Sequence, residues 1–149
     1  MTAASESPAL KERILRVQTS TFAFKEQLTK RLMFLVDAFA DDYEGCQLSM
    51  SSMDAFLTFL ELSSPPRYPD ITLTPPGDVY AEWRNDRGAS LSIEFLSDGD
   101  VRYIVLRPNP NHPQRIDRLS GLTTSDALLV SIKSAVTPTT PTALMGFAA

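Results

Sequence analysis

Apolar residues in the first third of the chain recur at steps of three, four or seven, which places them along one stripe of a helix. The stripe consists of Leu10, Ile14, Val17, Phe24, Leu28, Leu32, Leu35 and Phe39. Ser7 followed by Pro8 is typical of a helix start, because the first helical position does not need the N–H that proline lacks. The pattern therefore predicts helical structure from Pro8 to near Gly45.

Residues 19–21 are Thr, Ser and Thr, whose side chains compete with helical hydrogen bonds. The stripe thus predicts either one long helix or two helices with a break near Thr19 to Thr21. A continuous helix of about 35 residues would span on the order of 50 Å and would need a partner along its protruding half. Two helices would instead pack on the same core, and the sequence leaves both arrangements open.

A second helical pattern covers residues 51–62. Ser51 and Asp54 have the spacing of a capping box, with Asp in place of the usual Glu or Gln. The prolines that follow end this helix, because proline cannot continue the hydrogen-bond ladder. The apolar face of the helix consists of Met53, Phe56, Leu57 and Leu60.

From Asp70 the pattern changes to short strands separated by turn residues, which indicates an antiparallel meander. Asp98 and Gly99 predict a two-residue turn, which pairs Ile93 with Ile104 on the flanking strands. The expected strands cover residues 70–74, 79–84, 90–96 and 101–107.

The C-terminal third contains a predicted loop, helix and tail. Residues 108–115 include three prolines, too many for a strand, and are expected to form a surface connection. Residues 123–136 combine Thr, Ser and Asp caps with apolar residues at helical spacing, and residues 137–149 are expected to be flexible. The patterns together predict a single α+β domain over residues 1–149, with N-terminal helices in 8–64, a three- to four-stranded antiparallel β-meander in 70–107, and a C-terminal helix packed on one sheet face.

Alternation within the strands assigns side chains to two faces of the sheet. Paired carboxylates act as acid and base only in a concave, water-poor setting, so we interpret Glu82 and Glu94 as members of cross-strand ion pairs. The side chains expected on the open face are Tyr80, Glu82, Arg84, Glu94 and Tyr103. Those expected to face a core made by the helices are Val79, Ala81, Trp83, Leu91, Ile93 and Phe95.

The strand 101–107 has apolar residues on both sides, which is usual for a strand that is covered twice. We therefore expect something to lie over the nominally open face: the C-terminal tail, the proline-rich loop or another protein.

Charge and residue content argue against several kinds of site and partner. A net charge of −4 argues against a protein that binds nucleic acid by neutralising phosphates. The single histidine, His112, leaves no multi-histidine metal site or histidine-based triad, and one cysteine, Cys46, leaves no internal disulfide. We expect no cofactor, no nucleic-acid partner and no membrane partner. Acidic and other charged residues near the N-terminus, where a signal peptide would be basic and then apolar, favour a cytoplasmic location.

Residues 69–103 carry, in order, the patterns P-x-I, T-P-x-G, E-W, L-x-I-E-F and D-G. In this segment the chain resembles a group of small, uncharacterised bacterial proteins. Pro76 departs from the pattern, which has Asp at that position. The matching residues belong to turns and the core, so the resemblance implies a bacterial or mobile-element origin rather than an activity. They are Pro69, Pro75, Gly77, Glu82, Trp83, Asp98 and Gly99.

The leading hypothesis is a non-enzymatic protein that binds another protein, in the manner of an antitoxin or an accessory regulator. One alternative is a small hydrolase or transferase that uses Glu82 or Glu94 with Tyr80 or Tyr103, in a pocket closed by loop 108–115. Another is a homodimer formed through residues 10–39 as a coiled coil. The candidate partner-binding residues are Tyr80, Glu82, Arg84, Glu94 and Tyr103 on the sheet, and Ile14, Val17 and Phe24 on the helical stripe.

Overall fold

The computed structural model describes residues 3–20, 23–42, 48–63 and 67–134. Within this part the fold is α+β, as the sequence predicts. None of the described helices is long and apolar enough to cross a bilayer. The elements are α1 (Ala3–Leu15), the 3-10 helix η1 (Arg16–Thr19), α2 (Lys25–Asp42), α3 (Met50–Ser63), β1 (Asp70–Leu73), β2 (Val79–Arg84), β3 (Ser90–Phe95), β4 (Asp100–Pro108), β5 (Ile116–Thr124) and α4 (Ser125–Ser134).

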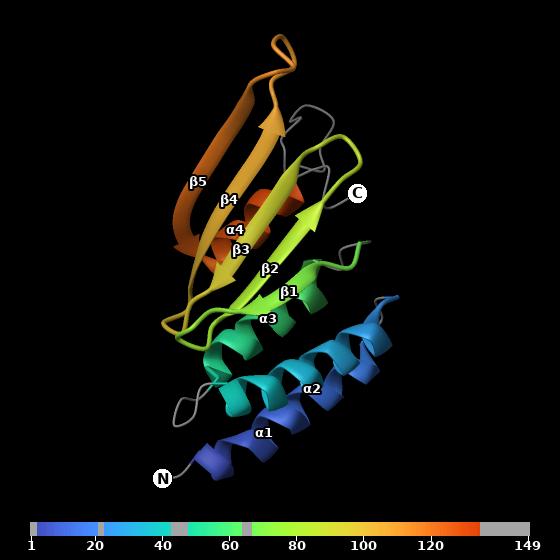
Figure 1. Cartoon of the computed structure of the whole chain (residues 1–149), viewed down its shortest axis with the longest axis vertical. Coiled ribbons are helices and arrows are strands. Elements are labelled where there is room, and N and C mark those ends of the chain that lie inside the picture. The colour runs from blue at the N-terminus through green and yellow to red at the C-terminus, as the bar shows by residue number, and fades with distance from the viewer. Residues whose placement is uncertain (1–2, 21–22, 43–47, 64–66, 135–149) are drawn as a thin grey trace.

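The five strands form one antiparallel sheet in the order β1-β2-β3-β4-β5 (Figure 1). Helix α3 packs against β2 and β3, and α4 packs against β4 and β5, both on the same face. Helices α1 and α2 lie side by side at the β1 end of the molecule, where α1 contacts α3 and α2 contacts β1. The described elements therefore cover one face of the sheet and leave the other open.

The core lies between α3 and the covered face of the sheet. The rings of Phe56 and Phe59 both meet Phe95 edge to face, with centroids 5.4 and 5.5 Å away. The single tryptophan, Trp83, lies beside Phe59 and donates its indole N–H to the Arg67 carbonyl at 3.1 Å. The predicted inward residues of β2 and β3 and the predicted apolar face of α3 are all buried, and both predictions are confirmed.

The N-terminal stripe forms two helices that fold back on each other. The backbone of Ser20 is extended (φ −76°, ψ 164°), which ends η1 within the predicted break, before α2 begins at Lys25. The predicted start at Pro8 is wrong, because α1 begins at Ala3 and Pro8 lies inside it. The helix tolerates this position at the cost of one backbone hydrogen bond that proline cannot donate.

Packing of α1 and α2 on the rest of the chain buries the residues that we expected to contact a partner. Ile14 and Val17 are fully buried and Phe24 is 9% exposed, and all three belong to the core. Arg13 is also buried, and its guanidinium donates to Asp54 at 2.7 Å and to Glu61 at 3.2 Å, both on α3. Because their own chain covers them, these apolar residues cannot be a free contact surface, and the prediction for them is corrected.

The cap of α3 also differs from the prediction. The hydroxyl of Ser49, not that of Ser51, accepts the hydrogen bond from the Ser52 N–H at 3.1 Å. Ser51 instead donates to the Ser97 carbonyl at 2.8 Å, and Asp54 pairs with Arg13. The helix begins at Met50, so the side chain that satisfies its first turn lies one residue before it.

The β3–β4 turn has three residues rather than the predicted two. The Leu96 N–H donates to the Asp100 carbonyl at 2.9 Å, and Gly99 has a φ of 94°. This geometry shifts the register by one residue, so that Ile93 pairs with Tyr103 and not with Ile104. A three-residue loop with glycine in the left-handed region is a common alternative for the same Asp-Gly pair.

Strand β5 is the element that the sequence did not predict. Its apolar residues, Ile116, Leu119 and Leu122, recur every third position and so alternate between the two faces, which hides the period of two. Residues 123 and 124, predicted as helix, belong to β5, and the Thr124 hydroxyl caps α4 by accepting from the Ala127 N–H at 3.1 Å. The predicted tail, 137–149, lies outside the described residues.

Candidate protein-binding face

The open face of the sheet brings together four of the predicted site residues. Register pairs Tyr80 with Glu94 and Glu94 with Arg102, while Glu82 and Arg84 follow on β2. These side chains share a face because alternate residues of a strand point the same way. The prediction that Tyr80, Glu82, Arg84 and Glu94 lie on one face is therefore confirmed.

Both glutamates of this face form ion pairs with arginine. Arg84 donates to Glu82 at 3.0 Å along β2, and Arg102 donates to Glu94 at 3.2 Å across β3 and β4. The hydrogen bond and charge of Glu82 raise the pKa of Arg84 further above its already high value. The arrangement fits ion pairs that stabilise the sheet better than a general acid and a general base.

Tyr103 lies on the opposite face, as a consequence of the corrected register. It packs against the core and covers Gly121 of β5, where an added Cβ would approach the tyrosine hydroxyl to 2.7 Å. The expected group of Tyr103 with Glu82 and Glu94 is therefore not assembled. The loop 109–115 stands at the far tip of the β4–β5 hairpin (Figure 1), with the Asn109 N–H bonded to the Arg115 carbonyl.

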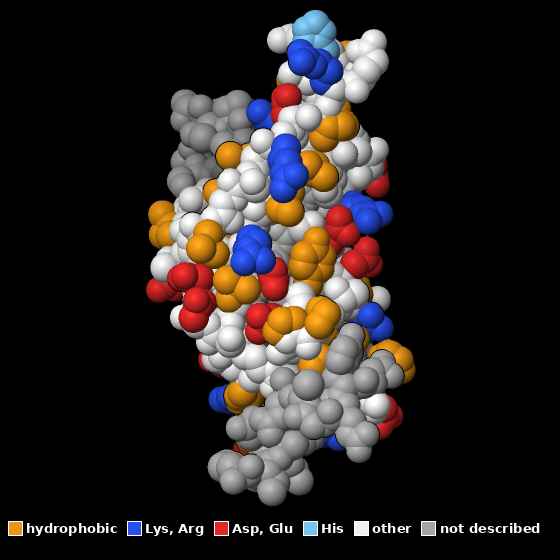
Figure 2. Space-filling view, turned by 60° about the vertical axis from the view of Figure 1, so that its left-hand side comes forward, with side chains coloured by type: hydrophobic (Ala, Val, Ile, Leu, Met, Phe, Trp, Pro, Cys, Tyr) orange, Lys and Arg blue, Asp and Glu red, His pale blue; other side chains and the backbone are white. Residues whose placement is uncertain are grey.

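The same open face carries apolar side chains toward β5. Ile104 and Leu106 of β4 are half-buried, and on β5 the side chains of Ile116 and Leu122 are 57% and 61% exposed. Figure 2, which brings the β5 side forward, shows hydrophobic side chains there among arginines and acids. No described helix covers this surface, so β4 keeps apolar residues on an uncovered side.

Asp78, immediately before β2, has an unusual environment for a carboxylate. It is only 7% exposed, and burial raises the pKa of its carboxyl. The negative charges of Glu94 and Asp98 raise this pKa further. The sequence offered no signal for this, because Asp78 occupies an ordinary turn position.

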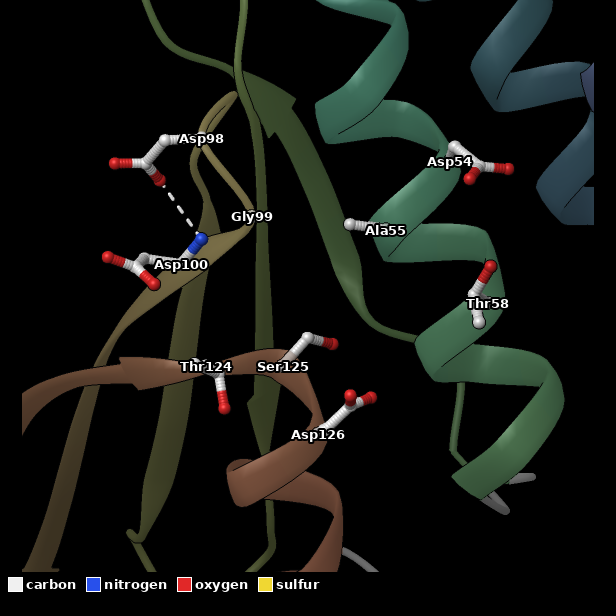
Figure 3. A pocket seen from close by; sticks show the side chains of 9 residues that line it. All are labelled: Asp54, Ala55, Thr58, Asp98, Gly99, Asp100, Thr124, Ser125 and Asp126. Carbon is white, nitrogen blue, oxygen red and sulfur yellow. Dashed lines mark hydrogen bonds between the residues drawn. The ribbon is translucent and has the colours of Figure 1, made fainter.

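A pocket of about 410 Å³ lies between α3, the β3–β4 turn and the start of α4 (Figure 3). Four aspartates line it, but Asp54 points to the far side of α3 and Asp98 accepts a hydrogen bond from the Asp100 N–H within the turn. Among the described residues, no three acidic, histidine or cysteine side chains come close enough together to hold a metal ion. The pocket therefore has no ligand geometry that assigns it a chemistry.

Comparison with protein-family models, with curated proteins and with solved structures found no match for this chain.

Proposed function

We propose that this chain is a non-enzymatic protein-binding module, in the manner of an antitoxin or an accessory regulator, and that its partner docks on the open face of the sheet. The observation that carries the proposal is the apolar centre formed by Ile104 and Leu106, which no described element covers. Tyr80 and the two ion pairs flank this centre. An apolar centre with a polar rim is usual for a protein-binding patch, and tyrosine and arginine are enriched in such patches.

The face also fits recognition better than catalysis. Its two glutamates are held by arginines at 3.0 and 3.2 Å, which positions them as charged rim groups. Exposed pairs of this kind contribute little to stability, roughly 0 to 1 kcal/mol, but they select a partner with complementary charge. We therefore expect the partner to present an apolar side chain surrounded by both charge signs.

The test compares two lysine substitutions of apolar residues in capture from a bacterial lysate. Ile104→Lys places a charge in the centre of the face, whereas Leu62→Lys changes a 52% exposed leucine at the end of α3. A protein that the wild type and Leu62→Lys retain, and that Ile104→Lys loses, supports the proposal. Retention of the same proteins by all three chains, or of none by the wild type, contradicts it.

A further inference from the structure

The two edge strands of the sheet differ in length and in how they are covered. Strand β1 has four residues, and Arg31 of α2 donates twice to the Ile71 carbonyl, at 2.8 and 3.1 Å, so a side chain occupies an outward backbone group of that edge. Strand β5 has nine residues, and no described element lies beyond it (Figure 1). Proteins normally shorten or cover an edge strand to prevent pairing with another chain, and in the described part of the chain β5 has neither protection.

The hydrogen-bonding direction of β5 follows from its hairpin. The bond from the Asn109 N–H to the Arg115 carbonyl fixes which residues of β5 face β4, because antiparallel pairs alternate. The odd-numbered residues from Asp117 to Thr123 bond to β4. The backbone groups of Ile116, Arg118, Ser120 and Leu122 therefore point away from the sheet.

We propose that β5 pairs antiparallel with β5 of a second copy, with the two-fold axis at Leu119, so that two sheets join into one. In this register Ile116 of each copy lies opposite Leu122 of the other, and the two Leu119 side chains meet at the axis. These three residues are the large exposed apolar side chains of β5, at 57%, 61% and 59% exposure. A single register thus covers all of them at once.

Neighbouring registers are less favourable. Centring the axis on Arg118 would place two arginines directly opposite each other, and like charges in that position destabilise a pair. Centring it on Ser120 would place Arg118 opposite Leu122 and Ile116 opposite Thr124. The Leu119 register instead puts Arg118 opposite Ser120, where no charge faces another.

The expected dimer is weak. Nine residues of strand extend about 30 Å, and edge pairing alone buries less than the roughly 800 Å² per partner of a standard interface. We therefore expect a concentration-dependent dimer with a dissociation constant in the micromolar range. This interface shares Ile116 and Leu122 with the open face but does not include Ile104 or Leu106, where the proposed partner docks, so either can exist without the other.

Sedimentation of the full chain up to about 200 µM, far above a micromolar dissociation constant, tests the proposal. Ser120→Pro removes an outward N–H that makes no bond within the sheet, so it should weaken the dimer at least about tenfold while circular dichroism stays native. Leu122→Lys should do the same by adding a charge, and Ser120→Ala and Leu62→Lys should leave the dimer intact. A monomer at every concentration, or a dimer that both edge variants retain, overturns the proposal.

Cysteine crosslinking tests the register of the β5 pair, in a protein whose single cysteine, Cys46, is replaced by serine. Leu119→Cys would bring two thiols together across the axis at a distance that a disulfide spans. Ser120→Cys would leave them diagonal and should crosslink much less. Equal or reversed crosslinking overturns this register. A monomer that still captures a protein through Ile104 would refute the dimer and leave the proposed function standing.

Discussion

Ser52 is a small polar residue in the dry contact between α3 and the sheet. Its side chain is fully buried, and its hydroxyl donates to the Phe95 carbonyl while it accepts from the Val79 N–H at 2.8 Å. One oxygen therefore joins the first turn of a helix to two strands. A buried polar group with both bonds made is stable, but loss of one partner leaves the other without compensation.

Ser52→Ala should lower the free energy of unfolding by about 1 to 3 kcal/mol, because two buried backbone groups lose a partner. Ser51→Ala removes an exposed hydroxyl next to it and should change stability by no more than about 0.5 kcal/mol. Urea unfolding of the three proteins measures both values. Equal effects of the two substitutions would show that the Ser52 bonds are not the cause.

The raised pKa of the Asp78 carboxyl implies that stability depends on pH. Its pKa is raised in the folded protein, so the folded state binds this proton more tightly than the unfolded state does, and stability is lost as pH rises through the titration of the group. Asp78→Asn should therefore stabilise the protein at pH 7, and its advantage should shrink as the pH falls toward the acidic range. Thermal unfolding across pH measures this, with Glu12→Gln at an exposed position as the control. An advantage that stays constant with pH would contradict the mechanism.

Among the elements, helices were easier to predict than the strand register. The one-sided burial of α3 imposes a helical period on its apolar residues, so the sequence displays the face directly. The Asp98-Gly99 pair, in contrast, suits two turn lengths, and only packing of the adjacent strands selects one. The resulting shift of one residue moved Tyr103 to the covered face, and it explains why one predicted site residue was misplaced.

Gly99 contributes to stability because glycine adopts the left-handed backbone conformation of the turn without strain. Its φ is 94°, and an added Cβ would meet nothing within 4 Å, so the cost of a side chain comes only from the backbone. Gly99→Ala should destabilise the protein by about 1 to 2 kcal/mol. Ser97→Ala in the same turn should be nearly neutral. Chemical denaturation of both variants tests this, and a neutral Gly99→Ala would argue against the left-handed turn.

Helices α1 and α2 show why burial could not be predicted from the stripe alone. A stripe of apolar residues looks the same whether its own chain or a partner covers it, and only the break at Ser20 lets α1 fold back. Strand β5 is the opposite case, because an edge strand with both faces largely exposed needs no alternation. The open face was predictable in β2 and β3, where one-sided burial enforces the period of two.

Because α1 is part of the same core as the sheet, the molecule should unfold as one unit. Ile14 on α1 and Trp83 on β2 both belong to a single apolar cluster, and α3 contacts both elements. Trp83 fluorescence reports on the sheet, whereas far-UV circular dichroism mainly reports on the helices. The two signals should therefore change at the same denaturant concentration.

Ile14→Ala leaves a cavity in the shared core and should lower the free energy of unfolding by about 2 to 5 kcal/mol. Both transitions should therefore move together to a lower denaturant concentration. Leu15→Ala changes a neighbouring side chain that is 51% exposed, and it should change the free energy of unfolding by no more than about 0.5 kcal/mol. If α1 were instead a docking helix, Ile14→Ala would leave the Trp83 transition in place. Its effect would then depend on protein concentration, because the lost contact would be between chains.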